Sequence, residues 1–201
     1  MEQSIYQSPE SVIEGTGVRE TTTDEFYVVS NSKFLILMIA TAGLYEFYWF
    51  YKHWSQYSRR HHAGMWPIMR AIFPIFFTHS LFNYLDSRVE KQPPSFWWNS
   101  ALFASVYVIL AILSKVADKV AERVPTEHLT FLDIAGWVAL PVCVAILYQA
   151  QRVANIACGD SAGKSNNRLT GLNYLWIAIG IGLWALVIFG IFYADSFIEP
   201  V

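Results

Sequence analysis

The sequence predicts an all-α integral membrane protein with four transmembrane helices and one further interfacial or re-entrant segment. Hydrophobic residues make up 54% of the chain and charged residues only 15%, whereas a soluble domain carries about 25% charged residues. The chain also has eight tryptophans, and tryptophan gathers at membrane–water interfaces. Four apolar runs approach or exceed the length of about 17–25 residues that a helix needs to cross a bilayer.

Residues 1–30 are expected to form a flexible acidic tail that leads into a single membrane domain at residues 31–195. The tail lacks the basic start and early apolar core of a cleaved signal peptide. Near its end, residues 26–29 are a candidate extended entry segment. Ser30 or Ser32 can then cap the first helix, because a hydroxyl at the N-cap accepts a free backbone N–H.

The four predicted spans cover residues 34–51, 96–113, 131–148 and 172–192. The first is interrupted by Glu46 and ends in an aromatic cluster. The second begins with Trp97 and Trp98, which is typical of an interfacial belt. The third contains Pro141, which neighbouring helices in a membrane can accommodate. The fourth carries no charged residue.

Residues 66–85 are apolar enough to cross a membrane, but they contain Arg70 and two prolines. An arginine at the bilayer centre costs about 2.5–3.5 kcal/mol on insertion scales. If this segment does not cross, residues 52–95 and 150–171 share one side with nine of the 14 cations, against five on the other. The positive-inside rule favours that split. We therefore expect an interfacial or re-entrant segment here, with both termini facing away from the cytoplasm.

Three motifs resemble catalytic or ligand-binding patterns but lack their context. Residues 159–163 spell Gly-x-Ser-x-Gly around Ser161, yet a nucleophile elbow needs a strand before the serine and a histidine after it. All five histidines precede Ser161. A phosphate-binding loop ending at residues 163–165 would need a glycine where Cys158 stands. His61 and His62 lack a third metal ligand at a suitable spacing. The sequence therefore predicts no catalytic, cofactor-binding or metal-binding residue.

Glu46 and Arg70 are the candidate functional residues. Glu46 is the one acidic residue well inside a predicted span, and ionisable groups within a membrane are functional candidates by default. Arg70 is its nearest plausible partner if residues 66–85 fold back. We expect the two side chains to pair.

Two further sets are assigned to contacts. Basic residues next to the first span should touch anionic lipid head groups: Lys52, Arg59 and Arg60. Small residues in the fourth span should let another helix approach closely: Ala178, Gly182 and Gly190.

The run GLYEFYWFY at residues 43–51 resembles the first helix of small, uncharacterised bacterial inner-membrane proteins. The leader YQSP at residues 6–9 is similar to the Tyr-Gln-x-Pro start of others. This resemblance implies a multi-pass protein of the bacterial inner membrane. It implies no activity and no site residues.

The expected function is non-enzymatic: contacts within or beside the bilayer, in a regulatory, accessory or immunity-type role. The expected partners are anionic lipid head groups and a protein partner or further copies of the chain, without nucleic acid. The alternative is a subunit of an oligomeric small transporter or ion channel, with a pore lined by Glu46, Asn99, Asp133 and Asn173. An enzyme acting on lipid or isoprenoid substrates ranks third, with Arg70, His79 and Asp86 as its candidates.

Overall fold

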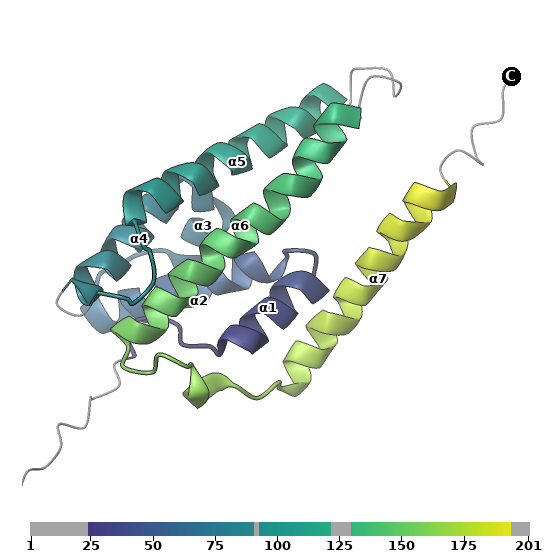
Figure 1. Ribbon diagram of the computed structural model, residues 1–201. Coiled ribbons are helices and arrows are strands. Elements are labelled where there is room, and N and C mark those ends of the chain that lie inside the picture. Colours follow the sequence, from purple (N-terminus) through teal and green to yellow (C-terminus); the bar gives the residue numbers. More distant parts are fainter. Residues whose placement is uncertain (1–23, 91–92, 122–129, 194–201) are drawn as a thin grey trace, which may run out of the picture.

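The computed structural model describes residues 24–90, 93–121 and 130–193, in which every regular element is helical (Figure 1). The all-α prediction is confirmed for these residues. The rest of the predicted tail, residues 1–23, lies outside them, as do residues 194 and 195 of the predicted membrane domain. The helices are α1 (Asn31–Ala40), α2 (Tyr45–His61), α3 (Pro67–Ile72), α4 (Pro74–Val89), α5 (Ser100–Ala121), α6 (Thr130–Ala157), the short 3₁₀ helix η2 (Lys164–Asn166) and α7 (Gly171–Tyr193).

The predicted first span is wrong, because the chain turns at residues 41–44 and separates α1 from α2. Ala42 and Gly43 adopt positive φ angles of 49° and 87°, and the Gly43 N–H donates to the Met38 carbonyl at 2.9 Å. The Thr41 hydroxyl donates to the Leu37 carbonyl at 2.7 Å and accepts the Tyr45 N–H at 3.0 Å. These bonds satisfy both helix ends at the turn.

The turn folds α2 back against α1 as a helical hairpin. The Phe34 ring lies 6.2 Å from the Tyr45 ring and 6.3 Å from the Trp49 ring. In one continuous helix, Phe34 and Tyr45 would be separated by about 16 Å of rise. α1 alone has ten residues, which is too short to cross a bilayer.

Residues 66–85 form most of a second hairpin, made of α3 and α4. Pro67 and Pro74 each start a helix, a position where the missing proline N–H costs nothing. α4 runs alongside α2: Phe77 packs on Trp54 at 6.3 Å, and Tyr84 stacks on Tyr57 at 4.5 Å between ring centroids. The short α3 precedes the break at Phe73 and also contacts α2.

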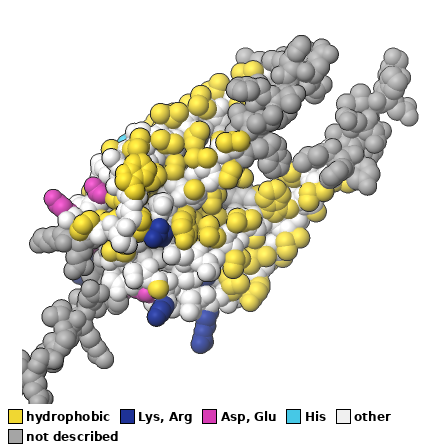
Figure 2. All heavy atoms as spheres, in the orientation of Figure 1, with side chains coloured by type: hydrophobic (Ala, Val, Ile, Leu, Met, Phe, Trp, Pro, Cys, Tyr) yellow, Lys and Arg dark blue, Asp and Glu magenta, His cyan; other side chains and the backbone are white. Residues whose placement is uncertain are grey.

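α5, α6 and α7 are the long helices, and in Figure 1 they extend beyond the two hairpins in a common direction. Of the described residues, two helices are long and apolar enough to cross a membrane: Ser100–Val120 and Gly171–Gly190. Only 17% and 6% of their apolar windows are buried, so neither resembles the core helix of a soluble protein. Their exposed apolar surface, visible in Figure 2, indicates association with a membrane.

Four transmembrane helices are not supported. The predicted second span begins at Ser100 rather than at residue 96 and belongs to α5. The third lies within α6, which continues through Pro141 to Ala157. The fourth lies within α7.

An aromatic core fills the space between the hairpins, α5 and α6. Its largest fully buried side chains include Phe34, Trp49, Trp54 and Phe82. The entry segment, which the structure extends to residues 24–30, contributes Phe26 and Val29 to this core, with 1% and 0% of their surface exposed. The prediction that the tail extends to residue 30 is therefore wrong for these residues. The cap prediction is confirmed at Ser30, whose hydroxyl accepts the Lys33 N–H.

Candidate functional site

A set of buried polar side chains on α2 and α6 holds the backbone of the entry segment. We call Trp49, His53, Gln151 and Asn155 the polar clamp. The Asn155 amide donates to the Val29 carbonyl at 2.9 Å, and its oxygen accepts the Val29 N–H at 3.3 Å. Gln151 donates to the Tyr27 carbonyl at 2.9 Å. Side chains thus replace the strand partner that this extended backbone would otherwise need.

Hydrogen bonds also connect the clamp residues to one another. The Trp49 indole N–H donates to Gln151 Oε1 at 2.6 Å, and Gln151 Nε2 donates to Asn155 Oδ1 at 2.8 Å. His53 Nε2 lies 3.4 Å from Gln151 Oε1. Because that oxygen can only accept, Nε2 carries the hydrogen. Burial lowers the pKa of His53 to about 3, so the ring is neutral at physiological pH.

The clamp is sealed from solvent, since all four of its side chains are 0% exposed. A general base must reach the proton that it abstracts, and a closed clamp offers no such path. Its chemistry is therefore structural: it satisfies the buried backbone of the entry segment.

The loop after α6 holds the entry segment from the other side. Asp160 accepts the backbone N–H groups of Lys164 and Ser165 at 2.9 and 2.8 Å. Asn166 then donates to the Val28 carbonyl at 2.9 Å. Gly163 has a φ of 61°, and a Cβ there would lie 2.4 Å from the Val29 carbonyl oxygen. The glycine therefore permits a close backbone approach.

The Gly-x-Ser-x-Gly run forms this same loop. It is preceded by a helix, α6, and Ser161 is exposed on the loop surface. The motif therefore lacks the strand–serine–helix context of a nucleophile elbow. Asp160 fixes the shape of this loop, and Gly163 lets the loop backbone approach the entry segment.

An ion cluster ties the start of the entry segment to the ends of α2 and α4. The buried Glu25 carboxylate lies 2.7 Å from His61 Nε2 and 2.8 Å from Arg88. The Tyr57 ring lies 4.3 Å from the His61 ring on one side and 4.5 Å from the Tyr84 ring on the other. The cluster brings together three segments that are far apart in sequence.

Glu46 and Arg70 are not paired, so that prediction is wrong. The Tyr107 hydroxyl on α5 donates a hydrogen bond to the Glu46 carboxylate. Burial raises the pKa of Glu46, and the Tyr107 hydrogen bond opposes this shift. The Arg70 guanidinium instead lies over the rings of Trp54 and Phe77, 4.4 and 4.6 Å from their centroids.

We expect Glu46→Gln to change the free energy of unfolding by less than about 1 kcal/mol, because the glutamine oxygen can still accept from Tyr107. Tyr107→Phe should cost about 1–2 kcal/mol by leaving Glu46 without its donor. Thermal unfolding in detergent should show the two substitutions to be non-additive, whereas Glu46→Gln and Arg70→Gln should add. Strong coupling of Glu46 to Arg70 would contradict this assignment.

The predicted lipid contacts are cations on α2. Arg59 and Arg60 are exposed near its C-terminal end. Lys52 is half-buried, with its ammonium 5.7 Å from the centroid of the Tyr27 ring.

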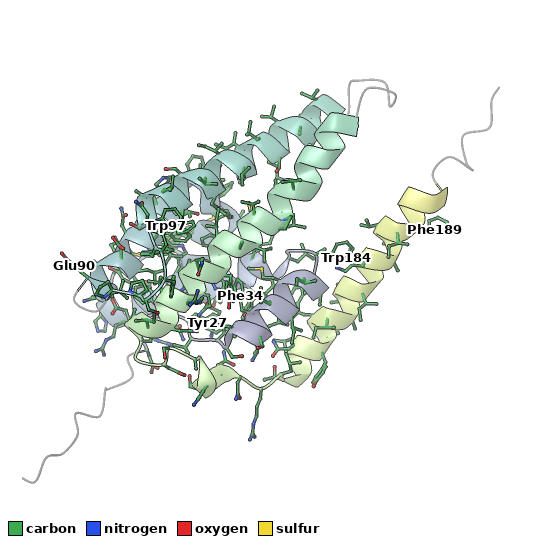
Figure 3. All side chains as sticks on the ribbon, viewed as in Figure 1. Tyr27, Phe34, Glu90, Trp97, Trp184 and Phe189 are labelled. Atoms are coloured by element: carbon green, nitrogen blue, oxygen red, sulfur yellow. The ribbon has the colours of Figure 1, made fainter. Side chains whose placement is uncertain are left out.

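The predicted packing residues of α7 do not face the bundle. Ala178, Gly182 and Gly190 are exposed, and a Cβ built on either glycine meets nothing within 4 Å. The contact is made at Gly180, where a Cβ would lie 1.9 Å from the Ala40 carbonyl oxygen. Trp184, one turn later, donates its indole N–H to the Ile39 carbonyl at 2.8 Å (Figure 3). Ile177, Gly180 and Trp184 are spaced three and four residues apart, and this spacing is the sequence signal that places them on one face of the helix.

The residues named for the alternative functions are held by separate local contacts. Asn99 and Asn173 accept backbone N–H groups at the starts of α5 and α7, and the Asp133 side chain lies outside the described residues. His79 contacts Ser105 at 3.2 Å, and Asp86 accepts from Trp98 at 2.8 Å. No group of three His, Cys, Asp or Glu side chains in the described part of the chain could hold a metal ion.

Comparison with known proteins adds no family assignment: no family model matches the chain, and no curated protein or solved structure is significantly similar to it.

Proposed function

We propose that this chain is a non-enzymatic protein of the bacterial inner membrane that acts by binding another transmembrane helix through the outer face of α7. The observation that carries the proposal is how little of α7 the rest of the chain covers. Only 6% of its 18-residue apolar window is buried. A helix held so lightly by its own chain retains most of its surface for a partner.

The outer face of α7 is suited to close helix packing. Ala178, Gly182 and Ala185 fall on one side of the helix and are all exposed. Small residues at such spacings let two helix backbones approach closely, which is the main source of attraction between helices in lipid. Gly180 and Trp184 attach the opposite side to α1, so both sides can be occupied at once.

The two hairpins favour a particular membrane placement. α1 has ten residues and is about 15 Å long, half of a hydrocarbon core of about 30 Å. We infer that the α1–α2 and α3–α4 hairpins enter and leave the same face, while α5, α6 and α7 cross. The face at which the hairpins enter carries several cations, including Arg59, Arg60, Lys164 and Arg168. Toward the opposite face, the far half of α5 carries Lys115 and Lys119. The positive-inside rule then makes the hairpin face cytoplasmic.

This placement revises the topology inferred from sequence, because it moves the entry segment to the cytoplasmic side. With the native cysteines replaced, Asp24→Cys and Ser161→Cys should react with a membrane-impermeant thiol reagent only from the cytoplasm. Asp118→Cys should react only from the opposite side. Labelling of Asp24→Cys and Ser161→Cys from opposite sides would support four spans and refute the re-entrant hairpins.

Gly182→Leu tests the proposed function. The new side chain enters open space, so the protein should accumulate normally and keep its melting temperature. It should lose a partner, or a second copy, that co-purifies with the wild type in mild detergent. The matched control is Ala101→Leu, which adds bulk at an exposed position of α5 and should retain the partner. If the Gly182→Leu variant still co-purifies with every partner of the wild type, α7 faces only lipid and the proposal fails.

A further inference from the structure

An apolar groove of about 400 Å³ lies between α2, α3 and α7. It follows two turns of α2, from Leu44 beside the α1–α2 turn to Tyr51. Ala71 and Ile72 of α3 line it on another side, and α7 contributes Trp176. The lining side chains are aliphatic or aromatic, three of them tyrosines, and the surface that they present to the groove is almost wholly apolar.

Lys52 places a positive charge just beyond the Tyr51 end of this groove. Tyr48, which lines the groove, packs edge-on against Tyr27 at 5.9 Å between ring centroids. Lys52 follows Tyr48 by one helical turn, and its ammonium lies 5.7 Å from the Tyr27 centroid. The Tyr27 hydroxyl accepts from Asn166 at 3.2 Å, and Asn166 in turn accepts from Lys33 at 2.7 Å. Lys33 and Lys52 therefore both lie near Tyr27, but Lys33 is buried and the Tyr27 hydroxyl also accepts from Tyr45 at 3.3 Å, so Lys52 is the lysine that a ligand can reach.

Neither lysine has an acidic partner within the described parts of the chain. The ion pairs found there join Glu25 to His61 and Arg88, and Lys115 to Asp118. Lys33 uses Nζ to bind two neutral oxygens, on Asn166 and on the Arg168 backbone. The positive charge at this end of the groove is therefore not neutralised by the fold.

We propose that the groove binds one acyl chain of an anionic phospholipid, with the lipid phosphate beside Lys52. The chain runs from the charged end toward the α1–α2 turn, which the hairpin placement puts inside the bilayer. The head group then stays at the cytoplasmic face, where cations attract anionic lipid. The apolar groove and the unpaired positive charge therefore follow one another in the same order as the acyl chain and the phosphate of a lipid.

The size of the groove favours a single chain over a partner helix. A helix with its side chains is about 10 Å wide, so two turns of one would occupy about 800 Å³. That is twice the volume of the groove. This inference uses the proposed membrane placement but not the partner contact on α7, because the outer-face residues of α7 do not line the groove.

The test uses the purified full chain in mild detergent, titrated with dioleoyl phosphatidylglycerol or dioleoyl phosphatidylcholine. Retained lipid is counted by native mass spectrometry, and the melting temperature is followed in parallel. We expect one phosphatidylglycerol to bind more tightly than phosphatidylcholine and to raise the melting temperature more. Lys52→Gln should weaken phosphatidylglycerol binding about fivefold, the effect of one cation at a lipid surface. Ile72→Trp, which fills the groove, should abolish retention of either lipid.

Two control variants separate this site from general membrane attraction. Lys164→Gln removes an exposed cation from the same end of the bundle, and Ile109→Trp adds the same bulk at an exposed position of α5. Both should bind lipid as the wild type does. Equal binding of the two lipids, an equal loss in Lys164→Gln and Lys52→Gln, or retained lipid in a folded Ile72→Trp variant would each overturn the proposal. Loss of the protein partner in Gly182→Leu with lipid binding intact would show the two functions to be separate.

Discussion

Replacing Asn155 with leucine is expected to lower the free energy of unfolding by about 2–5 kcal/mol. Asn155 alone satisfies both the N–H and the C=O of Val29, a residue with no exposed surface. Each buried polar group left without a partner costs about 1–3 kcal/mol. The substitution also removes one of the two acceptors of Gln151 Nε2, so the rest of the polar clamp is affected. Denaturant or thermal unfolding in detergent measures the change.

Asn83→Leu is the matched control for this substitution. Asn83 is exposed on α4, and surface substitutions of this kind usually change stability by less than about 0.5 kcal/mol. If Asn155→Leu costs no more than Asn83→Leu, the entry segment does not depend on the polar clamp.

Replacing Gly180 with leucine is expected to separate α7 from α1. A Cβ at this position would lie 1.9 Å from the Ala40 carbonyl oxygen and 2.7 Å from the Thr41 Cα. Both are backbone atoms, which cannot move aside as the end of a flexible side chain can. Forcing bulk into a packed contact costs about 1–3 kcal/mol, occasionally more. The Trp184 bond to Ile39 should also be lost, because it spans the same contact.

The indole N–H of Trp184 reports whether α7 remains docked, because it donates to the Ile39 carbonyl across this contact. We expect its hydrogen exchange to be slow in the wild type and much faster with Gly180→Leu. Gly182→Leu is the matched control, since it places the same side chain two residues away in open space, and it should leave the exchange slow. Equal exchange in the two variants would mean that α7 is not held at Gly180.

Local properties of the sequence determined the helical class and the two long apolar helices, α5 and α7. Composition and run length suffice for these because a helix satisfies its own backbone hydrogen bonds within the segment. Ser30 was also predictable, since an N-cap depends on the few residues that follow it. The absence of a strand before Ser161 could likewise be read from the apolar helix that precedes the Gly-x-Ser-x-Gly run.

Only the tertiary structure decided where the apolar run at residues 34–51 breaks. Composition alone predicts that this run forms one transmembrane span. The break needs Ala42 and Gly43 at positive φ, and it is stabilised by the packing of Phe34 on Tyr45 and Trp49. That packing is a consequence of the turn itself, so no local pattern could reveal it.

The candidate sites depend on the same long-range contacts. Glu46 stands out in the sequence as an acid within an apolar run, but its partner, Tyr107, lies 61 positions away on another helix. From the sequence alone, Gln151 and Asn155 belong to the polar end of a helix. They are buried because the entry segment, 126 positions before Asn155, packs against them. Sequence identifies the groups that need partners, because that need is a property of the side chain. Which partner each one finds depends on how the hairpins fold back on one another.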